Sequence, residues 1–333
     1  MNDDESPPLP LCAYIATGGT IAMTLDPRTG AAVPALSGDD LLGSVPAIRR
    51  IARFEVDNVS NVPSDYMGPL RWMALHDTVA AALARPEVVG AVISHGTDTL
   101  EETAWFLDLT VASHKPVVMI GAQRNASSPD FDGPRNLLNA ARVCVSPHAC
   151  DKGVLIVLNN QINAAREATK THTADVESFK SGDFGFLGTV DDDQVIFARA
   201  PLRRQHVPLV RRALPYVEIV PMYGGADGAM VRAAVGLGAR GIVVQALGFG
   251  NVNVEMFDAI GQAIAAGVVV VVSTRVPNGR VRPRYGFAGG GSTLQAAGAV
   301  FADNLSPHKA RILLMLALQT LTNPRDIQRL FDR

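Results

Sequence analysis

The sequence has few cysteines and lacks the common metal-binding and nucleotide-binding motifs. Its three cysteines, Cys12, Cys144 and Cys150, are odd in number and lack paired spacing, so we predict reduced structural thiols. None of the seven histidines shows the His-x-x-x-His spacing of a metallohydrolase. The segment 248–250 lacks the third glycine of a dinucleotide fingerprint, and no segment matches the Gly-x-x-x-x-Gly-Lys-Ser/Thr phosphate loop. We therefore expect neither a metal ion nor a cofactor.

Long apolar runs and an excess of one charge are also missing. The longest purely aliphatic run, Val268 to Val272, is far too short to span a bilayer. Thirty Lys and Arg stand against thirty-two Asp and Glu, and a net charge of −2 favours no polyanion-binding surface. The amino terminus, Met1 to Pro8, is acidic and proline-rich, unlike a secretory signal. These patterns predict a cytoplasmic protein that binds neither membranes nor nucleic acid.

Strand-like apolar runs alternate with helical segments along most of the chain, in which 47% of residues are hydrophobic. Up to about residue 200, we expect strands at 12–17, 88–94, 116–121 and 153–158, and helices near 69–84, 100–112 and 135–145. Alternation of this kind predicts an α/β fold with a mostly parallel, doubly wound sheet. We therefore assign residues 1–197 to a larger amino-terminal domain.

A second, smaller α/β domain is predicted at residues 216–333, after a polar, proline-bearing linker at 198–215. Its expected strands are 216–221, 241–245 and 268–273, and its expected helices lie near 230–236 and 254–266. Ser306-Pro307 and Asn323-Pro324 each predict the start of a further helix, because proline suits the first helical position. Gly289-Gly290-Gly291-Ser292 is interpreted as a flexible turn.

Two glycine-rich turns each present a threonine after a strand-like run. They are Ala16-Thr17-Gly18-Gly19-Thr20 and Ser94-His95-Gly96-Thr97-Asp98, the second followed by Thr99-Leu100-Glu101-Glu102, which fits a helix capping box. Glycine leaves backbone N–H groups accessible, so such turns can form an oxyanion hole beside a threonine hydroxyl. Ligands bind at the carboxyl ends of strands in open α/β sheets. A plain turn and a simple helix cap are the alternatives.

A threonine nucleophile needs a neighbouring base, and Lys170 is the candidate. A lysine can serve as that base when it is desolvated or lies near other cations. Spacing alone does not connect Lys170 with Thr97, and a solvated loop lysine is the alternative. For His95, which stands at no diagnostic spacing from a partner, we expect a structural role.

These residues resemble the bacterial-type L-asparaginases, which include the glutaminase-asparaginases, and the resemblance covers nearly the whole chain. The segments that carry it are 16–22, 95–104, 115–122, 132–134, 169–171, 179–181, 248–253 and 309–311. The resemblance implies a cofactor-independent amidohydrolase that acts on a small amino-acid amide. It also implies a homotetramer built from intimate dimers, in which a neighbouring subunit completes each site.

The resemblance also implies a role for each matching residue. Thr20 matches the acyl-accepting nucleophile, and Thr97, Asp98 and Lys170 match a second catalytic cluster that polarises a threonine and its bound water. The expected substrate contacts, apart from those of the second cluster, come from Gly19, Ser64, Asp65, Gly96 and Asn253. Two members of the second catalytic cluster, Thr97 and Asp98, are expected to bind the substrate in addition to their catalytic role. Ser64 would hold the α-carboxylate and Asp98 the α-ammonium group, while Asn253 would act across a subunit interface.

Three departures from the family pattern concern the substrate pocket. Asp65 stands after Ser64, where the secreted-type enzymes commonly have glutamine, and adds a possible carboxylate partner for the substrate ammonium. The loop from Met23 to Ser37 contains no tyrosine, for which Tyr66 is a hypothetical substitute. Arg280, Arg282 and Arg284 occupy the stretch where the family has a glutamate from the neighbouring subunit.

The principal hypothesis is hydrolysis of L-asparagine to L-aspartate and ammonia through an acyl-enzyme on Thr20. A glutaminase-asparaginase or another amidase is the alternative, which separate ammonia assays with asparagine and glutamine distinguish. A non-catalytic amino-acid-binding protein is the alternative of another class. Binding of asparagine without ammonia release would identify it.

Overall fold

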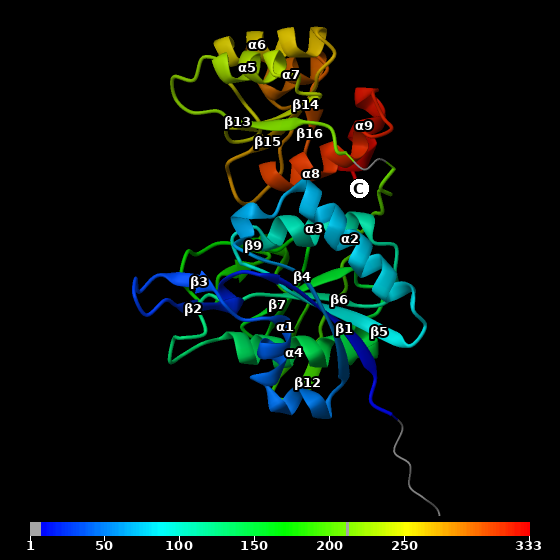
Figure 1. The fold of residues 1–333 in the computed structure, drawn as a ribbon. Helices are drawn as coiled ribbons and strands as arrows, with labels where there is room; N and C mark the ends of the chain where they lie inside the picture. The colour runs from blue at the N-terminus through cyan, green and yellow to red at the C-terminus, as the bar shows by residue number, and fades with distance from the viewer. Residues whose placement is uncertain (1–7, 211–212) are drawn as a thin grey trace, which may run out of the picture. The chain divides into compact units, whose positions relative to one another are not determined.

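The chain forms two compact units in the computed structural model, which describes residues 8–210 and 213–333 (Figure 1). The first unit ends at Arg204 and the second comprises Gln205–Arg333. The division between them falls inside the segment 198–215, and the domain bounds expected from the sequence stay a prediction. The predicted fold class is confirmed, because the larger unit is built on a mostly parallel sheet and the smaller unit on a second parallel sheet.

The sheet of the first unit has eight strands in the order β12-β11-β8-β7-β6-β5-β1-β4. Their bounds are β1 (Leu11–Gly18), β4 (Arg53–Val62), β5 (Val88–Ser94), β6 (Val117–Ile120), β7 (Val154–Leu158), β8 (Gln161–Ala164), β11 (Gly188–Asp191) and β12 (Gln194–Phe197). Strands β4, β1, β5, β6 and β7 run parallel, and the remaining three extend the sheet in antiparallel pairs. The central strands are mostly apolar and buried because helices cover both faces of the sheet.

Helices α2 (Pro69–Ala84) and α3 (Leu100–Thr110) lie on one face of this sheet, and α1 (Gly38–Gly43) and α4 (Gly133–Val145) lie on the other (Figure 1). Short 3-10 turns connect these elements, namely η1 (Thr20–Ala22), η2 (Pro46–Arg50), η3 (Ser64–Tyr66), η4 (Pro147–Ala149) and η5 (Gly182–Phe184). Two hairpins stand outside the sheet, β2 (Met23–Leu25) with β3 (Ala32–Pro34), and β9 (Thr169–Lys170) with β10 (Phe179–Lys180). The parallel arrangement brings the carboxyl ends of β1, β5 and β6 to the same edge.

The second unit contains four parallel strands in the order β13-β14-β15-β16. They are β13 (Val217–Pro221), β14 (Gly241–Ala246), β15 (Val269–Thr274) and β16 (Val300–Phe301), and the helices are α5 (Ala229–Gly236), α6 (Val254–Ala265), α7 (Gly291–Ala296), α8 (Pro307–Ala317) and α9 (Pro324–Phe331). Helices α8 and α9 begin at the two prolines that the sequence indicates. In the described parts of both units, no helix is long and apolar enough to cross a membrane.

The segment 289–292, predicted as a flexible turn, is a turn only in its first half, because Gly291 and Ser292 already belong to α7. Gly290 is the N-cap of α7, and Gly289 has a φ of +88°. A Cβ atom at Gly289 would lie only 2.4 Å from the carbonyl oxygen of Val252. Gly289 is therefore needed for close backbone packing and for a left-handed conformation.

Two of the three cysteines form a buried pair. The thiol of Cys144 on α4 donates to Cys12 Sγ on β1 over 3.5 Å, and both residues are buried. The hydrogen bond with Cys12 and the burial together raise the pKa of the Cys144 thiol. The reactive thiolate is therefore disfavoured at this position.

We expect one fast-reacting thiol in the native protein, that of the half-buried Cys150, when it is titrated with an aromatic disulfide reagent. Unfolding in denaturant should expose all three cysteines to the reagent. A Cys150→Ser variant should lose the fast phase. Three fast thiols in the folded wild-type protein would contradict the buried pair.

Candidate active site

The two glycine-rich turns meet at the carboxyl edge of the larger sheet. Strand β1 ends at Gly18, and Gly19 caps the 3-10 turn that begins with Thr20. Gly19 has a φ of +87°, and a Cβ atom there would lie 2.2 Å from Gly96 Cα. Only glycine permits this contact between the two backbones. The turn that carries Thr20 is thus packed directly against the turn that carries Thr97.

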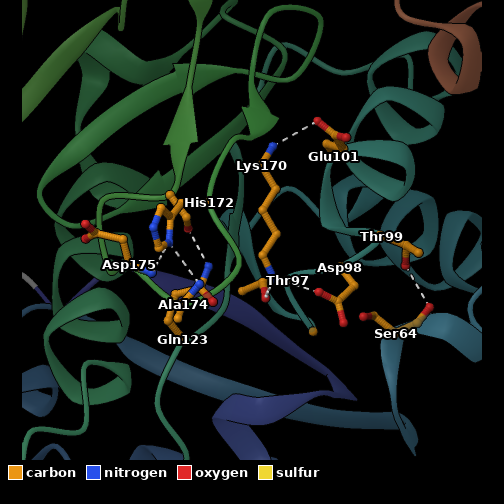
Figure 2. A network of polar contacts seen from close by, with 12 residues as sticks. Ser64, Thr97, Asp98, Thr99, Glu101, Gln123, Lys170, His172, Ala174 and Asp175 are labelled. Atoms are coloured by element: carbon orange, nitrogen blue, oxygen red, sulfur yellow. Dashed lines mark hydrogen bonds and ion pairs between the residues drawn. The ribbon is translucent and has the colours of Figure 1, made fainter. Parts of the chain in front are cut away.

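Lys170 joins the second turn from a distant part of the chain. Its Nζ atom lies 2.8 Å from Thr97 Oγ1 and 2.6 Å from Asp98 Oδ1 (Figure 2). Thr97 is buried, the Lys170 side chain is mostly buried, and the Asp98 side chain is 63% exposed. The ammonium group therefore pairs with a carboxylate at the surface and donates to a hydroxyl in the interior. This arrangement can stabilise negative charge that develops on Thr97 Oγ1.

Ser64 is held against the same turn. A Cβ atom at Gly96 would lie 2.8 Å from Ser64 Oγ, so the serine packs on bare glycine backbone. The hydroxyl of Thr99 donates to the Ser64 carbonyl oxygen over 2.7 Å (Figure 2). Asp65, which follows in η3, is exposed. The structure thus brings Ser64 to the two turns and presents Asp65 at the surface beside it.

The predicted capping box at the start of α3 is wrong. Thr99 occupies the N-cap position, but its side chain makes no capping hydrogen bond. Its hydroxyl instead makes the contact with Ser64, 35 residues away in the sequence. A local capping pattern cannot reveal this, because the competing acceptor is brought close only by the packing of η3 against the β5–α3 turn.

Asn253 lies in the second unit, where its side chain makes hydrogen bonds to the backbone. Its Oδ1 atom accepts from Met256 N over 2.9 Å and caps α6, while Nδ2 donates to the Ala226 carbonyl oxygen over 2.5 Å. Both functional groups of the side chain are thus engaged within that unit. The predicted role of Asn253 in binding substrate remains a prediction.

His95 is fully buried and its two ring nitrogens lie in a chain of hydrogen bonds. Trp72 Nε1 donates to Thr103 Oγ1, which lies 2.9 Å from His95 Nε2. His95 Nδ1 lies 2.7 Å from the Gly96 carbonyl oxygen, which can only accept, so Nδ1 carries the proton and Nε2 accepts from Thr103. Burial lowers the pKa of His95 from 6.5 to about 4. A neutral His95 therefore supports the backbone of the Gly96 turn, in agreement with the structural role expected from the sequence.

Acidification should destabilise the fold through His95. The unfolded chain takes up this proton near pH 6.5, whereas the folded chain does so only near pH 4. The contribution of neutral His95 is therefore complete above pH 6.5 and is lost as the pH falls, by roughly 2–3 kcal/mol at pH 4.5. Urea denaturation of wild type and His95→Gln at pH 7.5 and 4.5 checks this. If the free energy of unfolding falls by the same amount between pH 7.5 and 4.5 in wild type and in His95→Gln, the predicted contribution of His95 is wrong.

The comparisons with known families cover almost the whole chain. Residues 12–203 match the model described as asparaginase, N-terminal, and residues 216–331 match the glutaminase/asparaginase C-terminal domain. The chain belongs to the asparaginase family. The predicted family is thereby confirmed.

Relatives of known name agree with this assignment. L-asparaginase 2 of Bacillus subtilis (strain 168) is 37% identical over 98% of this chain and 88% of its own length. A probable periplasmic L-asparaginase of Haemophilus influenzae is 37% identical over 97% of this chain and 93% of its own length. The crystal structure of a probable cytoplasmic L-asparaginase from Campylobacter jejuni matches with a TM-score of 0.90, at 36% identity, and covers 98% of this chain and 99% of that one. At the level of the family, the predicted enzyme class, a hydrolase of the L-asparaginase type, is confirmed.

Two residues that contact the β9–β10 hairpin beside Thr97 were not predicted from the sequence. Glu101 accepts from the backbone N–H of Lys170, and Gln123 donates to Ser178 beside the same hairpin. The only sequence pattern that could have drawn attention to Glu101 is its place as an acidic residue in the first turn of a predicted helix. No sequence pattern drew attention to Gln123. Among the described residues, no group of three or more His, Cys, Asp and Glu side chains is placed to hold a metal ion.

Proposed function

We propose that this protein hydrolyses L-asparagine to L-aspartate and ammonia through an acyl-enzyme on Thr20. The observation that carries the proposal is the contact of Lys170 Nζ with both Thr97 Oγ1 and Asp98 Oδ1, beside the turn that bears Thr20. It places a cation, a hydroxyl and a carboxylate where two glycine-rich turns meet. Named relatives that are L-asparaginases support the choice of substrate.

Unpaired backbone donors beside Thr97 support an oxyanion site. Within residues 8–210 and 213–333, no hydrogen bond from the backbone N–H of Gly96 or Thr97 to protein is found, and both residues are buried. Buried N–H groups without a partner are rare and cost free energy, so a ligand oxygen is a natural acceptor here. Gly19 N–H, in contrast, already donates to the Val62 carbonyl oxygen over 3.0 Å. We therefore assign the oxyanion contact to the second turn.

In the first half of the proposed reaction, Thr20 Oγ1 attacks the side-chain amide carbon of the substrate. The hydroxyl proton passes to the amide nitrogen, the C–N bond breaks, and ammonia leaves an ester on Thr20. Ser64 binds the α-carboxylate, and the exposed carboxylates of Asp65 and Asp98 bind the α-ammonium group. Charge complementarity between these groups and a zwitterionic amino acid supports the assignment.

In the second half, a water molecule bound by Thr97 attacks the ester. Lys170 donates to Thr97 Oγ1 and stabilises the charge that develops as the water loses a proton. The C–O bond to Thr20 breaks, one proton of the water passes to Thr20 Oγ1, and the water oxygen remains in the new carboxyl group of aspartate, whose own proton is released to solvent. Asp98 pairs with Lys170 over 2.6 Å and so keeps the lysine side chain beside Thr97.

Separate assays of ammonia release from L-asparagine and L-glutamine test this function. We expect turnover of asparagine with a larger kcat/KM than that of glutamine. A preference for glutamine would favour the glutaminase-asparaginase alternative. Binding of asparagine without ammonia release would favour a non-catalytic amino-acid-binding protein.

We also propose a homotetramer of intimate dimers in the cytoplasm. Three aromatic side chains on the second unit, Phe249, Tyr285 and Phe287, form one exposed cluster with ring centroids 5.8–6.3 Å apart. An exposed apolar cluster of this kind supports self-association. Light scattering after gel filtration measures the mass, and a monomer would contradict the proposal. Relatives named as cytoplasmic and as periplasmic both occur, so fractionation of cells is needed to test the compartment.

A further inference from the structure

Lys170 lies on a very short hairpin that belongs to neither large sheet. Strands β9 and β10 contain two residues each and pair only with one another, Lys170 opposite Phe179. An isolated two-stranded hairpin is marginally stable in water. The position of Lys170 Nζ must therefore depend on contacts that the hairpin makes with its surroundings.

The first such contact comes from the element that carries the rest of the cluster. Glu101 Oε2 accepts from the backbone N–H of Lys170 over 3.2 Å (Figure 2). Glu101 is buried in the first turn of α3, directly after the turn with Thr97 and Asp98. Glu101 thus links the strand of Lys170 to the turn of Thr97 independently of the lysine side chain.

The second contact holds the opposite side of the hairpin. Thr171 donates from both N and Oγ1 to the Ser178 carbonyl oxygen, over 2.7 and 2.9 Å, and so extends the pairing beyond β9. Ser178 is fully buried, and its hydroxyl accepts from Gln123 Nε2.

Gln123 is itself fixed to the edge of the large sheet. It follows β6, and its own N–H donates to Asp132 Oδ2 over 3.1 Å. Two residues earlier, a Cβ atom at Gly121 would lie 2.8 Å from Thr97 Cγ2. Gln123 thus ties the hairpin to the strand end beside Thr97.

We infer that Glu101 and Gln123 are positioning residues that hold the β9–β10 hairpin so that Lys170 stays on Thr97. Glu101 fixes the backbone of Lys170, and Gln123 fixes Ser178 on the returning strand. Neither side chain is assigned a contact with substrate. The inference rests on the proposed role of Lys170, and loss of either contact should lower kcat more than it raises KM. A displacement of about 1 Å at a reacting group can cost about 100-fold in rate.

The test compares Glu101→Leu and Gln123→Met with the conservative Glu101→Gln, whose amide oxygen can still accept from Lys170 N–H. Glu102→Leu, at the next position of the same helix, is the matched control. Acylation of lysines, followed by peptide mass spectrometry, measures how often Lys170 leaves its site. Lys180, on the paired strand and 42% exposed against 15% for Lys170, is the internal reference.

We expect Glu101→Leu and Gln123→Met to raise the acylation rate of Lys170 relative to Lys180 about 10-fold, because local opening becomes more frequent. Their kcat should fall by about 10- to 100-fold. Glu101→Gln and Glu102→Leu should stay within about 3-fold of wild type in both measurements. Circular dichroism identifies variants that have not folded, and if Glu101→Leu is among them, Gln123→Met carries the test.

Unchanged acylation and kcat in folded Glu101→Leu and Gln123→Met would overturn the inference. Equal damage in Glu101→Gln and Glu101→Leu would overturn it for Glu101, since the charge and not the hydrogen bond would then matter. The acylation measurement needs no substrate. If the wild-type protein releases no ammonia, the proposed function fails, whereas protection of Lys170 still tests the positioning.

Discussion

Replacement of Thr20 by alanine is expected to abolish ammonia release from L-asparagine, with kcat reduced by about 10⁴-fold or more. The hydroxyl is the proposed nucleophile, and the alanine variant has no atom that can form the ester. Binding should persist because the proposed carboxylate and ammonium contacts come from other residues. Stopped assays of ammonia measure kcat, and calorimetry measures binding of aspartate.

Thr24→Ala is the matched control for this variant. Thr24 lies a few residues further along, in the β2 hairpin strand, and has no proposed role in the reaction. The Thr24→Ala variant should retain nearly the full wild-type kcat for L-asparagine, and thermal melts should show that both variants are folded. If Thr20→Ala keeps more than about a tenth of the wild-type kcat, Thr20 is not the nucleophile.

Replacement of Lys170 by methionine should lower kcat by about 10³-fold. Methionine nearly preserves the length and packing of the side chain but removes the ammonium group that contacts Thr97 Oγ1 and Asp98 Oδ1. Charge developing on Thr97 would then lack its closest cation. The measurement is kcat for asparagine, together with accumulation of the ester on Thr20 by mass spectrometry if the second half-reaction becomes limiting.

Lys180→Met serves as the control because Lys180 lies on the paired strand and its ammonium group pairs with Glu177 outside the cluster. We expect less than about a 3-fold change in kcat for this variant, as for most surface ion pairs. A Lys170→Met enzyme that keeps kcat within about 3-fold of wild type, as expected for Lys180→Met, would remove Lys170 from the mechanism. Loss of both activities alike would point to damage of the hairpin as a whole.

Most elements of the parallel sheets could be predicted from the sequence because their signals are local. The strands at β5 and β7 are continuous apolar runs, as expected for strands buried on both faces. The edge strand β4 was missed although Arg53–Val62 alternates between exposed and less exposed positions. Its many polar residues suit an edge with one face partly in water, and they hide it from a search for apolar runs.

The candidate site was predictable to the extent that it depends on strand ends. Gly19 and Gly96 mark sharp turns at the carboxyl ends of β1 and β5, and parallel pairing of these strands brings the turns together. The order of the strands itself could not be derived from the local pattern. The family resemblance supplied the connection of Lys170 to Thr97, which are 73 residues apart.

The sequence by itself therefore determined the chemical groups of this protein and the strand ends on which they stand, because both depend on neighbouring residues. Only the tertiary structure decided which groups meet. The hydroxyl of Thr99 donates to the Ser64 carbonyl oxygen instead of capping α3, and the side chain of Asn253 caps α6. The carboxylate of Glu101 accepts from the backbone N–H of Lys170. The residues joined by the first of these hydrogen bonds are 35 positions apart in the sequence, and those joined by the last are 69 positions apart. Such partners are set by how the helices and hairpins pack, which no local pattern contains.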